Sequence, residues 1–81
     1  MRVLYFAWVR ERIGLPSEDV ATEAATVAEL VTELRARGPR YQAALGDLEA
    51  VRVAVDQVLS DFDAPIAGAG EVAFFPPMTG G

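Results

Sequence analysis

The C-terminal carboxylate is the group in this sequence with the clearest capacity for chemistry. The chain ends in Phe-Phe-Pro-Pro-Met-Thr-Gly-Gly, so a diglycine follows two prolines. Proline favours an extended backbone, and six extended residues from Pro76 to Gly81 would reach roughly 20 Å. Gly80 and Gly81 lack side chains, which lets a partner protein close tightly around the backbone. We therefore expect residues 76–81 to form a flexible tail that enters another protein; the alternative is a frayed chain end.

Few other side chains in the chain could catalyse a reaction. The 81 residues contain no histidine, cysteine or lysine, which removes the commonest general bases, nucleophiles and zinc ligands. The neighbouring carboxylates of Glu18 and Asp19, and of Asp61 and Asp63, lie in polar stretches typical of solvated surface. We expect no self-contained active site, no metal site and no cofactor bound by this chain.

Composition narrows the classes of partner and location. The formal net charge is −5 and all seven cationic side chains are arginines, which disfavours nucleic acid as a partner and favours a protein with a basic docking surface. Half of the residues are hydrophobic, enough for the core of one small domain. No signal-peptide pattern and no membrane-spanning apolar run is present, so we expect a cytoplasmic protein without a membrane partner.

The first elements that must position the tail are predicted from hydrophobic periodicity. Residues 3–8 form an apolar run typical of a central strand, and residues 9–14 follow as a polar connection. Residues 18–24 alternate weakly and favour an edge strand antiparallel to the first. The pattern therefore predicts that the chain begins with two paired strands.

One helix has strong start and stop signals. Thr26 and Glu29 form a capping box, and Gly38-Pro39 follows as a terminator. Residues 41–45 favour a short second helical turn. The apolar stripe of the main helix, at spacings of three and four, contains Val27, Leu30, Val31 and Leu34.

Three later segments are predicted to be strands: residues 51–55, 57–60 and 71–75. Alternation along the last strand places Val72 and Phe74 in the core and points Phe75 outward beside the tail. The same alternation puts Phe6 on the opposite face of the first strand from Tyr5. We expect Phe75 to be a docking anchor; the alternative is that both faces of the sheet are covered and Phe75 is core.

This order of elements, ending in Gly-Gly, resembles the ubiquitin-like β-grasp proteins, and in particular the small subunit of molybdopterin synthase, the MoaD-like sulfur carriers. The similar stretches are Val3–Ala7 with Arg10-Glu11, Val53–Gln57 and Gly70–Gly81, and the last is the most specific. The resemblance implies an α+β fold, with a mixed sheet of four to five strands packed on one main helix. It implies a β-grasp domain over residues 1–75 and a tail over residues 76–81.

The chain departs from the family pattern at three positions. Asp56 stands where such proteins usually carry asparagine, Ala69 replaces an acidic residue before the last strand, and Met78 replaces a smaller residue. These departures concern turns and the approach to the tail, and they leave the implied role of Gly81 unchanged.

The resemblance implies a function in molybdenum cofactor biosynthesis. A ubiquitin-activating-like adenylyltransferase would use ATP to adenylate Gly81, and a sulfurtransferase would then convert it to a thiocarboxylate. The tail would next enter the large subunit of molybdopterin synthase and donate its sulfur to cyclic pyranopterin monophosphate. ATP would be used by the activating enzyme, and the chain itself would be the sulfur-donating subunit of a heteromer.

Residue roles also follow from the resemblance. Gly81 would be the adenylated and thiocarboxylated residue, while Gly80 and Thr79 would let the tail thread a narrow channel. The residues expected to bind the partners are Phe75, Phe6, Leu59 and Arg10. For Arg10, the alternatives are a local ion pair with Glu11 or simple solvent exposure.

Two other functions use the same terminal group. One is a sulfur carrier for thiamin or tRNA thiolation, although thiamin carriers are typically shorter and lack the Phe6-Ala7 and Arg10-Glu11 opening. The other is a ubiquitin-like modifier, conjugated to lysines of other proteins through Gly81. A β-grasp RNA-binding module conflicts with the acidic charge and leaves the tail without a role.

Overall fold

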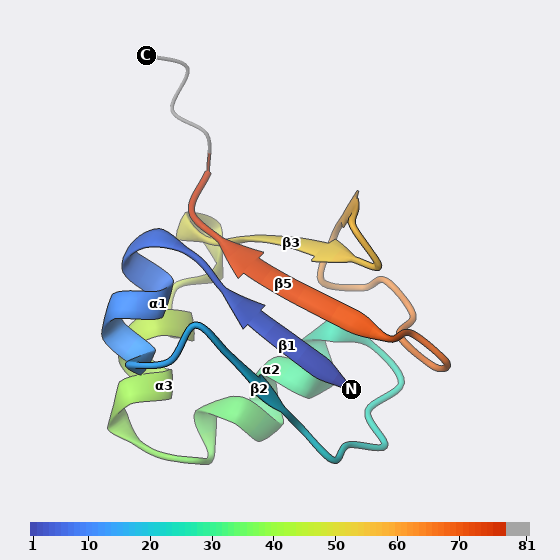
Figure 1. Ribbon diagram of the computed structural model, residues 1–81, viewed down its shortest axis with the longest axis horizontal. Coiled ribbons are helices and arrows are strands. Elements are labelled where there is room, and N and C mark those ends of the chain that lie inside the picture. The colour runs from blue at the N-terminus through green and yellow to red at the C-terminus, as the bar shows by residue number, and fades with distance from the viewer. Residues whose placement is uncertain (78–81) are drawn as a thin grey trace.

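The computed structural model describes residues 1–77, which form a five-stranded sheet with order β2-β1-β5-β3-β4 and helices packed behind it (Figure 1). The strands are β1 (Arg2–Tyr5), β2 (Ser17–Asp19), β3 (Arg52–Val55), β4 (Val58–Ser60) and β5 (Glu71–Phe75). The helices are α1 (Ala7–Ile13), α2 (Val27–Arg35) and α3 (Pro39–Leu45), with a short 3-10 helix η1 (Leu48–Ala50). The α+β class and the mixed sheet are as predicted; the predicted main helix is α2, the predicted second helical turn lies within α3, and α1 was not predicted.

The sheet is mixed because β1 and β5 at its centre are parallel, whereas the other neighbouring pairs are antiparallel. Side chains alternate across it, and one set packs against the apolar stripe of α2. Fully buried residues of this inner face are Val3, Tyr5, Val53, Val72 and Phe74. The predicted inward direction of Val72 and Phe74 is therefore confirmed.

Thr26 is the N-cap of α2 as predicted, but the Glu29 carboxylate accepts from the Thr26 hydroxyl at 3.2 Å and not from the Thr26 backbone N–H, so only half of the capping box forms. The Thr26 Oγ1 accepts a hydrogen bond from the Glu29 backbone N–H at 3.3 Å, and the apolar stripe of the helix is buried. The helix ends at Arg35, earlier than the predicted stop at Gly38-Pro39. Pro39 instead begins α3, because its fixed φ and missing N–H suit a first helical turn.

Helix α1 corrects the prediction for residues 3–14. The strand ends at Tyr5, and the region expected to be strand end and polar connection is helical from Ala7. Val9 and Ile13, four residues apart, are buried, and Gly14 at φ 92° ends the helix. The helix was not predicted because two buried positions in seven residues give too little helical periodicity to detect. In addition, Ala7 and Trp8 are apolar and extended the pattern expected of a strand.

Asp56 has a structural role at the β3–β4 turn. Asp56 and Gln57 adopt positive φ values of 47° and 69°, as a two-residue hairpin loop requires. The Asp56 Oδ1 accepts hydrogen bonds from the backbone N–H groups of Gly70 (2.9 Å) and Glu71 (3.0 Å). The departure from asparagine therefore keeps an acceptor that ties this hairpin to the start of β5.

Candidate functional site

The parallel pairing of β1 and β5 brings two aromatic residues to one end of the sheet. Tyr5 pairs with Phe74, and the next backbone N–H, that of Phe6, donates to the Phe74 carbonyl at 3.1 Å. Phe6 and Phe75 thus occupy adjacent outer-face positions, exactly one residue beyond the last buried pair. Phe6 is 48% exposed and Phe75 is half-buried, so Phe75 is not a core residue. The structure brings these two predicted docking residues together.

Leu59 lies on the same outer face, two strands away. It pairs with Ala54 of β3, and Ala54 pairs in turn with Ala73 of β5. Leu59 is 70% exposed, because its small neighbours leave it standing above the sheet at an edge strand. No described helix covers this face, which Figure 1 shows in front of α2 and α3. The outer apolar face consists of Leu4, Phe6, Ala54, Leu59, Ala73 and Phe75.

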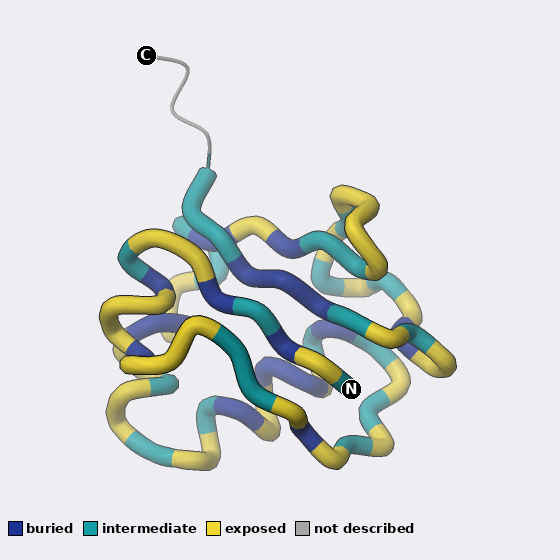
Figure 2. Tube along the Cα trace, in the orientation of Figure 1, coloured by how far each residue is buried: buried dark blue, intermediate teal, exposed yellow. Residues whose placement is uncertain are grey.

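Arg10 lies in α1 and not in the predicted connection. Its side chain is exposed, and within residues 1–77 the one ion pair joins Arg37 to Glu18, so Arg10 does not pair with Glu11. Figure 2 shows exposed backbone at the turn from β1 into α1, where the Phe6 carbonyl accepts from the Arg10 N–H at 3.3 Å. Arg10 is therefore available to a partner near Phe6.

The tail residues predicted to carry the chemistry, Thr79, Gly80 and Gly81, lie outside the described residues, as does Met78. The described chain continues from β5 through Pro76 and Pro77, both half-buried. The β5 strand therefore brings Pro76 and Pro77 to the end of the sheet that carries Phe6 and Phe75 (Figure 1).

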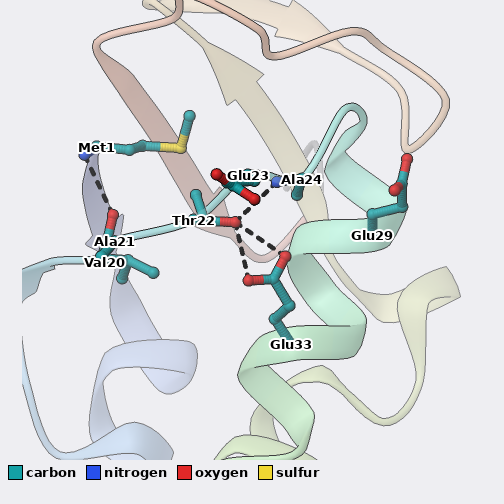
Figure 3. A pocket seen from close by; sticks show the side chains of 8 residues that line it. All are labelled: Met1, Val20, Ala21, Thr22, Glu23, Ala24, Glu29 and Glu33. Atoms are coloured by element: carbon teal, nitrogen blue, oxygen red, sulfur yellow. Dashed lines mark hydrogen bonds between the residues drawn. The ribbon is translucent and has the colours of Figure 1, made fainter.

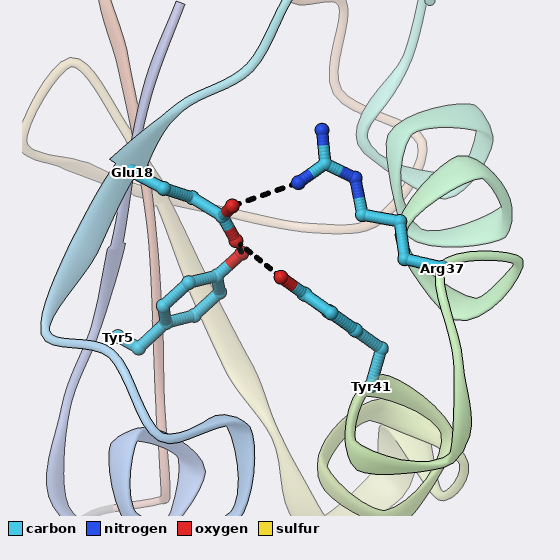
Figure 4. Close-up of polar contacts among 4 residues, drawn as sticks. All are labelled: Tyr5, Glu18, Arg37 and Tyr41. Carbon is cyan, nitrogen blue, oxygen red and sulfur yellow. Dashed lines mark hydrogen bonds and ion pairs between the residues drawn. The ribbon is translucent and has the colours of Figure 1, made fainter.

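A polar cluster that the sequence did not reveal fastens the inner face at its β2 edge (Figure 4). Glu18 accepts hydrogen bonds from the hydroxyls of Tyr5 (2.7 Å) and Tyr41 (2.9 Å), and an ion pair from Arg37 at 2.7 Å. Burial is the larger cause that raises the pKa of the Tyr5 hydroxyl, and the nearby Glu18 carboxylate raises it further. The hydroxyl therefore remains a neutral hydrogen-bond donor. These contacts join β1, β2 and α3 and serve the fold.

A surface depression lined by Met1, Thr22 and Glu33, among others, lies near the start of β1 (Figure 3). Its polar groups satisfy one another: the Thr22 hydroxyl contacts both carboxylate oxygens of Glu33 at 2.9 Å and accepts from the Ala24 N–H. The described residues contain no cluster of acidic side chains arranged to hold a metal ion. This depression offers no recognisable chemistry.

Arg52 is a residue near the tail that sequence reasoning missed. It pairs with Phe75 across β3 and β5, so the two side chains are outer-face neighbours. The Arg52 guanidinium donates to the carbonyls of Glu49 (3.1 Å) and Val51 (3.2 Å), which holds it against η1. The pairing of β3 with β5 places this cation beside Phe75, and that pairing is known only once the order of strands in the sheet is known.

Comparison with known proteins gives consistent results. The ThiS family model matches residues 3–81. The chain is 43% identical over 81 residues to the molybdopterin synthase sulfur carrier subunit of Escherichia coli, covering 100% of this chain and 99% of that one. The sulfur carrier subunit of Haemophilus influenzae is 33% identical with the same coverage.

A solved structure also matches the whole fold. SAMP1 from Haloferax volcanii superposes with a TM-score of 0.80 at 25% identity, covering 100% of this chain and 98% of that one. The fold is thus the ubiquitin-like β-grasp. No helix among residues 1–77 has the length and apolar character needed to span a bilayer.

Proposed function

The chain belongs to the ThiS family, and from this premise we propose that it is the sulfur-carrier subunit of a molybdopterin synthase. Relatives with this name match it along its full length. The structural observation that carries the proposal is the end of β5. There the apolar residues Phe6 and Phe75 flank the point at which the chain continues through Pro76-Pro77 toward Gly81.

The first chemical step takes place at Gly81. Its carboxylate, with a pKa of about 3.5, is ionised at neutral pH and is a poor electrophile. In a ubiquitin-activating-like adenylyltransferase it attacks the α-phosphorus of ATP and releases pyrophosphate, which gives an acyl-adenylate. A sulfurtransferase persulfide then attacks the carbonyl carbon and displaces AMP, and a thiol reductant cleaves the resulting acyl disulfide to leave a thiocarboxylate. The absence of lysine and cysteine from the chain means that it presents no side-chain amine or thiol to its own activated end.

The second step takes place in the large subunit of molybdopterin synthase. Thr79 and Gly80 thread the tail into that subunit, while Phe6, Leu59 and Phe75 dock on its surface. The thiocarboxylate sulfur attacks cyclic pyranopterin monophosphate, and water then cleaves the bond between this sulfur and the Gly81 carbonyl carbon, which regenerates the carboxylate. A second loaded carrier or a reloaded one provides the second sulfur of the dithiolene. The globular domain contributes binding and orientation, and the partner encloses the reacting groups.

Mass spectrometry of the intact protein tests this function. Protein incubated with the activating enzyme, ATP and a sulfur source is expected to show one oxygen-to-sulfur exchange at the C-terminus. Deletion of Gly81 should abolish the exchange and sulfur transfer while leaving the unfolding transition unchanged. A lasting series of lysine-linked adducts on other proteins would instead favour the modifier function.

A further inference from the structure

The charged side chains of residues 1–77 are segregated along the sheet. The end at which β5 begins, with the β3–β4 turn and the N-terminus of α2, is acidic. It carries seven carboxylates and one arginine: Asp19, Glu23, Glu29, Glu33, Asp56, Asp63, Glu71 and Arg2. Its formal charge is therefore −6, so more than the whole net charge of −5 resides there.

The end at which β5 finishes, with α1, α3 and η1, has the opposite sign. It carries five arginines and four carboxylates, a formal charge of +1: Arg10, Arg12, Arg35, Arg40, Arg52, Glu11, Asp47, Glu49 and Asp61, which follows the Ser60 partner of Val53. Within the part of the chain that the structure describes, none of these five arginines forms an ion pair. The remaining pair, Arg37 and Glu18, is neutral as a unit.

Several of these guanidinium groups are held in place by groups without net charge. Arg52 is held by two backbone carbonyls beside Phe75. Arg12 donates to the Ala43 carbonyl at 3.2 Å and lies over the Trp8 ring, 4.4 Å from its centroid. Carbonyls and aromatic rings fix the position of a cation without neutralising it, so the positive potential at this end is directed toward solvent.

We propose that the arginine-bearing end around Phe75 docks against an acidic protein surface that surrounds the tail-accepting channel of the partner. The inference rests on the proposed sulfur-carrier function. It specifies the charge of the partner surface that would meet the Phe75 end of the sheet. The net charge alone predicts a basic partner surface, but the structure places the excess negative charge at the end remote from the tail. An acidic channel rim attracts the +1 end of the domain and repels the −6 end, so the carrier approaches with the Phe75 end first.

Such a charge arrangement acts mainly on the rate of association. Complementary fields raise association rate constants by about 10- to 1,000-fold, and the gain falls steeply with ionic strength. Rim charges contribute to this steering even where they add little to affinity. The apolar residues Phe6 and Phe75 would then retain the carrier after the arginines have oriented it.

Stopped-flow association with the molybdopterin synthase large subunit from the same organism tests the inference. The matched variants are Arg52→Gln and Arg2→Gln, which remove one positive charge from the outer face at opposite ends of β5. At about 20 mM NaCl, Arg52→Gln should slow association about threefold, and Arg2→Gln should change it less than about 1.5-fold. Both differences should vanish near about 500 mM NaCl.

Two further variants separate charge from shape. Arg52→Lys should associate at the wild-type rate, because it keeps the positive charge, although it loses the planar guanidinium and its hydrogen-bond donors. Glu49→Gln removes a negative charge beside Arg52 and should accelerate association. Three results would overturn the inference but leave the proposed function standing. They are equal slowing of association by Arg52→Gln and Arg2→Gln, slow association of Arg52→Lys, and association of the wild-type chain at a rate independent of salt. Failure of the wild-type chain to bind the large subunit would overturn both the inference and the proposed function.

Discussion

The two faces of the sheet are built from alternate residues of the same strands, yet they have opposite environments. Phe74 and Phe75 are adjacent and chemically identical; Phe74 is fully buried against the helices, whereas Phe75 is half-buried on the uncovered face beside the tail. Tyr5 and Phe6 on β1 repeat this contrast. A period of two residues thus allows one short strand to hold the domain together and to place apolar side chains on an uncovered face.

The faces also differ at their edges. The inner face is closed at the β2 edge by hydrogen bonds to Glu18, which satisfy the hydroxyls of Tyr5 and Tyr41. The outer face ends in Leu59 and in the cation of Arg52, both exposed. Polar groups therefore serve packing on one face and remain open to a partner on the other. Substitutions on the two faces should separate stability from binding.

The largest separation is expected from the neighbouring phenylalanines. Phe74→Ala should lower the free energy of unfolding by about 3–5 kcal/mol, because it leaves a cavity in the closed core. Phe75→Ala should lower it by only about 1 kcal/mol and should weaken binding to the large subunit. Urea unfolding and a binding titration of both variants measure the contrast. Equal destabilisation would mean that Phe75 belongs to the core after all.

A smaller effect is expected at high pH from Tyr5. Its pKa is raised in the folded state above the ordinary value of 10.0, so the unfolded chain releases this proton first. Stability is fully present below that pH and is lost as the pH rises above it, by about 1 kcal/mol from about pH 10 to about pH 11.

The Tyr5→Phe variant isolates this contribution. Urea unfolding should show the stability difference between wild type and variant shrinking across the same pH range. A constant difference would show that the hydroxyl ionises equally easily in both states, and that the inner face is less closed than the structure indicates.

The smallest effect on stability is expected at Leu59. Leu59→Ala removes an exposed side chain of an edge strand, so the free energy of unfolding should change by less than about 0.5 kcal/mol. Binding to the large subunit should nevertheless weaken measurably, because the outer apolar face loses its most prominent side chain. Loss of stability without loss of binding would remove Leu59 from the docking surface.

Local patterns in the sequence predicted most of the strands and one helix. The N-cap at Thr26, and the alternation of Val72 and Phe74, depend on neighbours within a few residues and were confirmed. Helix α1 was missed because its helical signal consists of Val9 and Ile13 alone, within an apolar start that also suits a strand. Tertiary packing against α3 decides such a short segment.

The predicted docking residues show the same division. Phe75 was predicted from strand alternation and, together with Phe6 and Leu59, from the resemblance; the three lie on one face, with Phe6 and Phe75 at one end of the sheet. Arg52 was missed because its proximity to Phe75 depends on the pairing of β3 with β5, which are far apart in the chain. A single arginine in an alternating segment contains no signal of that proximity.

The sequence by itself determined the terminal diglycine, the lack of lysine, cysteine and histidine, and the alternation that separates core from surface along each strand. Only the tertiary structure decided that parallel β1 and β5 end together beside Phe6 and Phe75, and that the charges separate to opposite ends. The physical reason is that side-chain periodicity is a local property of the backbone. Strand order and the distribution of charge arise from contacts between residues distant in the chain, which periodicity does not encode.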